Sequence, residues 1–216
     1  MSLRHLFNYT ILMAFCFLYI SCKKSGPTPR ERKKETFYVT GTSNWATVYT
    51  HSSSNEIIHN TDLSGGTWYF PSYNHVGQIH SCFRFDLSSI PSDAIIYSAY
   101  LSLYSSPAPT GIFGPDANSG TINNHRIYRI VSPWNGNTFA SPGSTTDHFV
   151  DLPTTLSPFL DQIDLNVLQL VSAMKVGENH GFILVPQERQ FFNIRQFCSP
   201  VYPDQSLRPK LVVEYQ

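Results

Sequence analysis

The stretch CFRFDLSSIPSDAIIYSAYLSLY, residues 82–104, decides the fold of this chain. In its first half Phe83 and Phe85 alternate with polar residues, and in its second half Leu101 and Leu103 do the same. A side-chain period of two is typical of strands that bury one face. The two runs are separated by a turn that holds Ser and Pro. We therefore predict two strands whose apolar faces share one interior.

The same alternation recurs along the rest of the chain, in runs rich in aromatic and β-branched residues. The strand candidates are residues 37–40, 46–50, 67–70, 78–87, 95–104, 124–131, 149–152, 181–186, 190–194 and 210–215. Long segments rich in Pro, Gly, Ser and Asn lie between them, especially 105–123 and 132–148. The pattern predicts an all-β domain, a β-sandwich whose sheets each bury one face.

One segment, residues 164–177, has a helical period instead. Its apolar residues Val167, Leu170, Val171 and Met174 fall on one stripe. Asn166 can cap the start and Gly177 follows the last turn, which are ordinary helix boundaries. We expect this single short helix to lie across one end or face of the sandwich.

The N-terminal 21 residues read as a secretory signal. A short positive start precedes an uncharged apolar run at 9–20, which is too short for a membrane span of about 20 residues. The following Tyr19-Ile20-Ser21-Cys22 resembles the bacterial lipobox. That resemblance implies that Cys22 becomes the lipidated mature N-terminus and that its acyl chains, such as palmitate, anchor the protein to a membrane. A short anchor helix, or cleavage after Ser21 without lipid, is the alternative.

Residues 22–35 are predicted to form a solvated tether, because they combine Pro, Gly and a run of charges with no apolar residue. The domain then spans 36–216. It holds 8 Lys/Arg against 13 Asp/Glu, a balance that disfavours nucleic acid as a partner.

The domain cysteines Cys82 and Cys198 could form a disulfide in an oxidising compartment; two free buried thiols are the equal alternative.

Two runs carry a family resemblance. FRFDLSSIP at 83–91 with AIIYSAYLSLY at 94–104, and LRPKLVVEY at 207–215, resemble the core motifs of the DNRLRE domain family. The likeness runs from about Gly77 to Tyr215. It implies a jelly-roll-like β-sandwich and a non-catalytic role on secreted or surface proteins, since the family is related to disaggregatase repeats and includes alginate-binding modules. The matched positions are core and turn residues, so no ligand-binding residue is carried over.

Sugars bind to flat aromatic faces, with a few polar groups that read their hydroxyls. The candidate binding aromatics are Trp45, Trp68, Tyr69, Tyr73 and Tyr202, for each of which core packing is the alternative. Trp134 is expected in the core. Arg189 and Arg195 flank a strand and could clamp a uronate carboxylate; ion pairing at the surface is their alternative.

No catalytic motif is recognisable, and the carboxylates are not in a glycosidase setting. No metal site of thiolate spacing is present, although Asp147 with Asp151, or Asp161 with Asp164, could hold a structural Ca²⁺. We therefore predict no cofactor and no enzyme activity. The favoured function is polysaccharide or oligosaccharide binding by an exported, membrane-anchored lipoprotein of the bacterial cell envelope. A structural or adhesion subunit is the alternative, and a small polysaccharide-active enzyme comes third.

Overall fold

The computed structural model describes residues 30–51, 54–110, 113–137, 144–188 and 190–216. These residues form antiparallel strands, one α-helix and three short 3-10 helices. The strands are β1 Lys33–Tyr38, β2 Trp45–His51, β3 Ser54–Ile58, β4 Asp62–Phe70, β5 His75–Phe83, β6 Ile96–Leu103, β7 Asn118–Ser119, β8 His125–Ile130, β9 Ser144–Leu152, β10 Gln162–Asn166, β11 Phe182–Pro186, β12 Asn193–Cys198 and β13 Lys210–Tyr215. The helix α2 is Leu168–Val176, and the 3-10 helices are η1 Thr42–Asn44, η2 Pro71–Tyr73 and η3 Gln205–Leu207.

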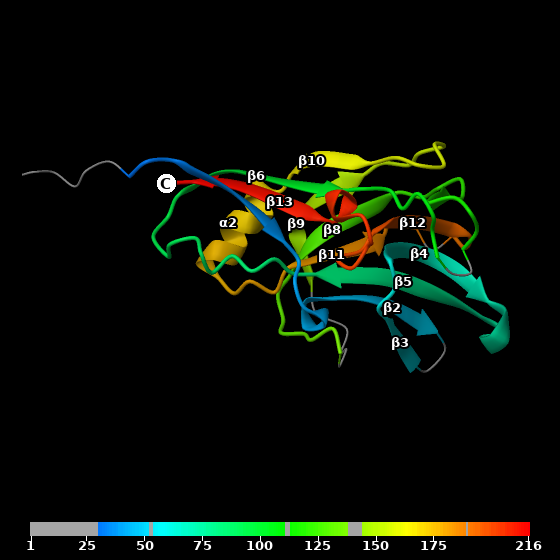
Figure 1. Ribbon diagram of the computed structural model, residues 1–216. Coiled ribbons are helices and arrows are strands. Elements are labelled where there is room, and N and C mark those ends of the chain that lie inside the picture. Colours follow the sequence, from blue (N-terminus) through cyan, green and yellow to red (C-terminus); the bar gives the residue numbers. More distant parts are fainter. Residues whose placement is uncertain (1–29, 52–53, 111–112, 138–143, 189) are drawn as a thin grey trace, which may run out of the picture. The chain divides into compact units, whose positions relative to one another are not determined.

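The strands form two sheets (Figure 1). The smaller sheet has the order β1-β13-β6-β10, and the larger has the order β7-β12-β4-β5-β11-β8-β9. Strands β2 and β3 belong to the same larger sheet, where β2 pairs with β5 on one side and with β3 on the other. Consecutive strands such as β5 and β6 lie in different sheets, so the chain crosses between layers. The predicted all-β sandwich with one short helix is confirmed.

The main core lies between the sheets. Phe83, Phe85, Leu101 and Leu103 belong to one buried cluster, as the alternating pattern predicted. Each such side chain stabilises the fold by roughly 1.5–3 kcal/mol through burial. Cys82, the neighbour of Phe83, points to a second cluster on the other face. The period of two therefore assigns both faces of β5 correctly.

Helix α2 buries its predicted stripe, and contacts β6 of one sheet together with β8 and β9 of the other. It ends as predicted: Gly177 closes the last turn through its N–H to Ala173 O. Its start differs, because residues 162–166 form β10 and pair with β6. The Asn166 side chain still accepts a hydrogen bond from Leu168 N at 3.1 Å. Pairing with a sheet edge has overridden the helical pattern there.

The expected tether ends earlier than predicted. Strand β1 begins at Lys33, whose backbone pairs with Tyr215 at the end of β13. Glu35 binds Lys33 Nζ at 3.0 Å and accepts from the Tyr215 hydroxyl at 2.9 Å. The sandwich therefore includes residues 33–35. The signal segment 1–21 and Cys22 lie outside the described residues, and no helix within the described part is long and apolar enough to cross a membrane.

The disulfide alternative is not met, since Cys82 and Cys198 are both free and buried. Cys82 packs with Ala46, Val48 and Trp134 on one face of the larger sheet. Cys198 lies on β12, where its thiol approaches Ser105 O at 3.8 Å. The two thiols thus point into different surroundings, in agreement with the alternative of two buried thiols.

Candidate functional site

A pocket of about 810 Å³ lies beside the β4–β5 turn. Its lining includes Trp68, Tyr69 and Phe192, together with Tyr49, Glu56 and Asn60. This pocket is called the aromatic pocket below. Figure 1 shows the β4–β5 turn at the opposite end of the sandwich from the start of β1. The pocket, which residues of this turn help to line, is therefore at the end of the domain far from the start of β1.

The floor of the aromatic pocket is a separate small core formed by Tyr49, Phe70, Ile79, Phe113 and Ile194. The Tyr49 ring centroid lies 5.6 Å from that of Phe70 and 5.5 Å from that of Phe113. Aromatic pairs at such distances contribute about 0.5–1.5 kcal/mol beyond their buried area. Strands β2, β4, β5 and β12 and the loop before β7 supply these residues, so the floor is held from several directions.

Two rings form the rim, the partly buried Trp68 and the exposed Phe192. Trp68 stands edge-on to Phe192, with centroids 5.2 Å apart, and edge-on to the buried Phe113 at 5.3 Å. Phe192 is 50% exposed and has a φ of 65°. A bulky side chain in the left-handed region is an outlier that costs about 1–3 kcal/mol, and such residues cluster at functional sites. The fold thus holds an apolar ring in solvent at an energetic cost.

The β4–β5 turn fixes the position of Tyr69. Its hydroxyl donates to Asn74 Oδ1 at 2.8 Å, and Asn74 itself closes η2 in a left-handed conformation. Close packing in this hairpin depends on Gly77, because an added Cβ would collide with Thr50 O and the Phe70 ring. The Tyr69 ring is therefore oriented by its own hairpin.

Two carboxylates act on the Tyr49 hydroxyl beside the aromatic pocket. Burial raises the pKa of the Tyr49 hydroxyl, and the nearby carboxylates of Glu56 and Asp62 raise it further. Tyr49 therefore stays protonated across physiological pH. Asp62 is buried, and its Oδ2 accepts from both the N–H and the hydroxyl of Thr110 at 2.6 Å.

The structure brings together two of the predicted binding residues, Trp68 and Tyr69. Trp45 is only 1% exposed and packs in the main core, edge-on to His59 at 4.8 Å. Tyr202 is partly exposed, away from the lining of the pocket. The side chain of Tyr73 and the whole of Arg189 lie outside the described residues.

Arg195 is not a surface clamp. It is fully buried on β12, opposite Gly65 of β4, and donates to Pro153 O. Burial lowers the pKa of its guanidinium to about 10. The His125 ring and Leu184 occupy the space that a side chain at Gly65 would need, so this part of the sheet is closely packed.

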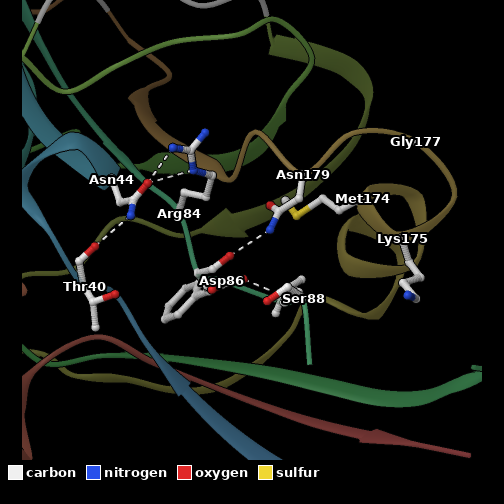
Figure 2. A pocket seen from close by; sticks show the side chains of 11 residues that line it. Thr40, Asn44, Arg84, Asp86, Ser88, Met174, Lys175, Gly177 and Asn179 are labelled. Carbon is white, nitrogen blue, oxygen red and sulfur yellow. Dashed lines mark hydrogen bonds between the residues drawn. The ribbon is translucent and has the colours of Figure 1, made fainter. Parts of the chain in front are cut away.

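A second hollow, of about 500 Å³, is polar and is shown in Figure 2. Arg84 Nε donates to Asn44 Oδ1 at 3.0 Å, while Asn44 Nδ2 donates to Thr40 O at 2.7 Å. Asn179 Nδ2 donates to Phe85 O at 2.7 Å. These side chains hold neighbouring backbone segments together. We therefore interpret this polar cleft as structural support for the crossing from β5 to β6.

Arg84 and Asp86, both in the FRFDLSS run, bind different groups. Asp86 accepts from Ser88 N at 2.9 Å, and this contact, ahead of the charge of Arg84, lowers the pKa of Asp86. Arg84 binds Asn44 and lies 5.7 Å from the centre of the Trp134 ring. Trp134 is buried as expected, and its indole N–H donates to His180 O at 2.6 Å.

The carboxylates considered for Ca²⁺ have protein partners. Asp151 binds Arg126 Nε at 2.7 Å, and Asp161 accepts from Ser105 N at 2.8 Å. Asp164 lies 3.5 Å from the Ser102 hydroxyl, and the Asp147 side chain is outside the described part. Within the described ranges, no group of three or more His, Cys, Asp or Glu could hold a metal ion.

Phe192 is the main site residue that sequence reasoning missed. The run 190–194 was expected to be a strand, but β12 begins only at Asn193. Adjacent aromatics were the available signal: Phe191 and Phe192 cannot both face the core of a strand with a period of two. The structure exposes both of them.

Comparisons with known proteins add no assignment. No protein-family model matches the chain, and no curated protein is similar enough to it to count as a match. The resemblance to the DNRLRE family therefore rests on the sequence motifs.

Proposed function

We propose that this protein binds carbohydrate in the aromatic pocket and catalyses no reaction on it. The observation that carries the proposal is the rim: Trp68 and the half-exposed Phe192 stand edge-on beside Tyr69, above a packed aromatic floor. Ring faces of this kind pack against the C–H faces of sugars, and nearby polar groups bind the hydroxyls. The neighbouring Glu56 and Asn60 supply such groups.

The sequence motifs support the same function. The DNRLRE domain, which the chain resembles at 83–104 and 207–215, usually serves as a non-catalytic module on secreted or surface proteins. An all-β sandwich is the fold that this resemblance implies. In that family the shared motifs build the scaffold, and here the FRFDLSS run lines the polar cleft and not the aromatic pocket.

We also propose that the protein is exported and held on a bacterial membrane by lipid on Cys22. The lipobox-like residues 19–22 support this proposal. The β4–β5 turn, which helps to line the aromatic pocket, and the start of β1 lie at opposite ends of the sandwich (Figure 1).

Affinity electrophoresis of the full chain in detergent tests carbohydrate binding. A panel of gels contains one soluble polysaccharide each, and we expect retardation in at least one gel. Trp68→Ala should weaken that retention at least tenfold, since stacking on an aromatic anchor contributes on the order of 1–3 kcal/mol. Tyr202→Ala is the matched control, because it removes a partly exposed ring outside the pocket.

Equal retention of the wild type and Trp68→Ala would show that the aromatic pocket is not the site. Retention by no polysaccharide, together with stable co-purification of a protein from the cell envelope, would favour the structural or adhesion role. Release of reducing ends from a polysaccharide by the purified chain would favour an enzyme.

A further inference from the structure

Another hollow, of about 440 Å³, lies beside the end of β1 in the smaller sheet. We call it the Tyr38 hollow. The described aromatic pocket is lined from β2, β3, β4, the segments that follow β3 and β4, and the residue before β12. The two hollows therefore share no lining residue. The Tyr38 hollow is lined by Tyr38, Val39, Thr40, Gln205, Ser206 and Arg208.

The aromatic wall of this hollow is Tyr38. Side chains alternate at the end of β1: Phe37 and Val39 are buried, whereas Tyr38 between them is 49% exposed. A period of two turns the Tyr38 ring away from the core, and pairing with Lys210 of β13 fixes its backbone. The sheet thus presents a half-exposed ring, and the C–H groups of sugars pack against such flat apolar faces.

The polar wall comes from the segment around η3. Asp204 caps this short helix, because its carboxylate accepts from Ser206 N at 2.9 Å and from Ser206 Oγ at 2.7 Å. Arg208 Nε donates to Tyr202 O at 2.7 Å, a contact that orients the guanidinium. The Gln205 amide and the Arg208 guanidinium therefore reach the hollow from a segment that its own hydrogen bonds hold in place.

The groups gathered here are complementary to a sugar residue. The amide of Gln205 both donates and accepts hydrogen bonds. The contact with Tyr202 O uses a single N–H of the Arg208 guanidinium, which carries several more in one plane. Neighbouring sugar hydroxyls can accept from such a planar donor while the ring lies over Tyr38. Because the polar wall is already ordered, binding costs less conformational entropy.

We propose that the Tyr38 hollow is a second carbohydrate-binding site, in which a glycan residue packs on Tyr38 and hydrogen-bonds to Gln205 and Arg208. This inference rests on the proposed carbohydrate-binding function and adds a site to it. A polysaccharide repeats its unit many times, so glycan can occupy both hollows of one protein. Two contacts with a repetitive ligand raise the apparent affinity above that of either contact alone.

Short oligosaccharides, prepared from the polysaccharide that the full chain retains best, count the sites. Isothermal titration of the full chain in detergent should give a stoichiometry of about two oligosaccharides per protein. Tyr38→Ala and Trp68→Ala should each remove one equivalent, and the double variant should bind none. In affinity gels, where one polymer offers many binding units, Tyr38→Ala should weaken retention about tenfold.

Three further variants separate a loss of binding from a loss of folding. Gln205→Ala changes an exposed side chain and leaves the backbone of η3 intact; it should weaken retention about fivefold, the effect of one lost hydrogen bond. Tyr38→Phe keeps the ring and should bind both equivalents. Tyr97→Ala removes another exposed ring of the same sheet, outside the hollow, and should also bind both equivalents.

A single equivalent that Trp68→Ala removes, with Tyr38→Ala and Gln205→Ala unchanged, would overturn the second site while the proposed function stands. A single equivalent that Tyr38→Ala removes and Trp68→Ala keeps would support the Tyr38 hollow and show that the aromatic pocket is not a site. An equal loss in Tyr97→Ala and Tyr38→Ala would overturn the assignment to the hollow. Retention by no polysaccharide would overturn the proposed function, and this inference with it.

Discussion

Trp68 and Phe192 meet edge-to-face, with their ring planes at 86° to each other. Trp68 lies on β4, opposite Gly77 of β5, so the residue paired with it has no side chain to cover its ring. Phe192 reaches it from the residue just before β12 through a left-handed backbone conformation. The rim of the aromatic pocket thus depends on one glycine and one strained phenylalanine.

The strain at Phe192 predicts an unusual order of stability. Phe192→Gly should be more stable than Phe192→Ala by about 1 kcal/mol, because glycine adopts positive φ without a Cβ penalty. Both variants lack the ring and should lose glycan retention equally. Urea unfolding gives the stabilities, and affinity electrophoresis gives the retention.

Phe191 is the matched control, since it is exposed but is not among the residues with positive φ. There the order should reverse, with Phe191→Ala more stable than Phe191→Gly, because glycine loses more chain entropy on folding. The same order at both positions would contradict the strain at Phe192.

Trp134 should matter for stability and not for binding. Trp134→Phe keeps an aromatic ring but removes the N–H that donates to His180 O at 2.6 Å. An unsatisfied buried carbonyl costs about 1–3 kcal/mol, which chemical denaturation should show. Glycan retention should match the wild type, because Trp134 packs in a different cluster from the floor of the pocket. Lost retention in a variant of unchanged stability would contradict this assignment.

The β-sandwich and its helix could be predicted because the spacing of apolar residues within each segment indicates a strand or a helix. Sequence spacing alone places Phe83 and Phe85 on one face of the chain, and Leu101 and Leu103 on one face of a strand. It also places the apolar residues of α2 on one stripe of the helix. Strand β3, Ser54–Ile58, was not predicted, because it is short and, among the described strands, pairs with β2 alone. Residues 164–166 of strand β10 were assigned to the helix, since the pairing of β10 with β6 depends on a distant segment.

The pocket could be predicted only in part. Trp45 and Trp68 are each preceded in sequence by two small or polar residues, Ser43-Asn44 and Gly66-Thr67. The difference in burial between the two rings depends on the strand register. Trp45 lies opposite Phe83 and belongs to the same core cluster, whereas Trp68 lies opposite Gly77. Phe113 and Ile194 reach the floor from distant segments. Such long-range pairing is not encoded in local periodicity.

The two buried thiols should be unreactive in the folded protein. Burial raises the pKa of Cys82 and raises that of Cys198 to about 12, so little thiolate forms near neutral pH. Alkylation of the native full chain, then of the denatured chain with a heavier reagent, should place only the second label on both residues. A disulfide-linked Cys82–Cys198 peptide, recovered without reductant, would contradict the free-thiol state.

His125 makes the sandwich sensitive to acid. It is buried against Gly65, and its Nδ1–H donates to Asn123 O at 2.9 Å. Burial, and secondarily the charge of Arg195, lowers its pKa to about 4, against an ordinary 6.5. Between these values the unfolded chain binds a proton that the folded chain does not. Stability is therefore complete above pH 6.5 and falls toward pH 4, by about 3 kcal/mol for this residue.

Urea unfolding at several pH values from 7.5 to 4.5 measures that loss of stability. His80 should add to it, because burial also lowers its pKa to about 4. His125→Gln should unfold with a shallower dependence on pH than the wild type, by the equivalent of one proton, even if it is less stable at pH 7.5. Exposed carboxylates such as Asp86 and Asp204, whose pKa values are lowered, act mainly below this window. An equal slope in wild type and His125→Gln would show that His125 is not the group that resists protonation in the folded state.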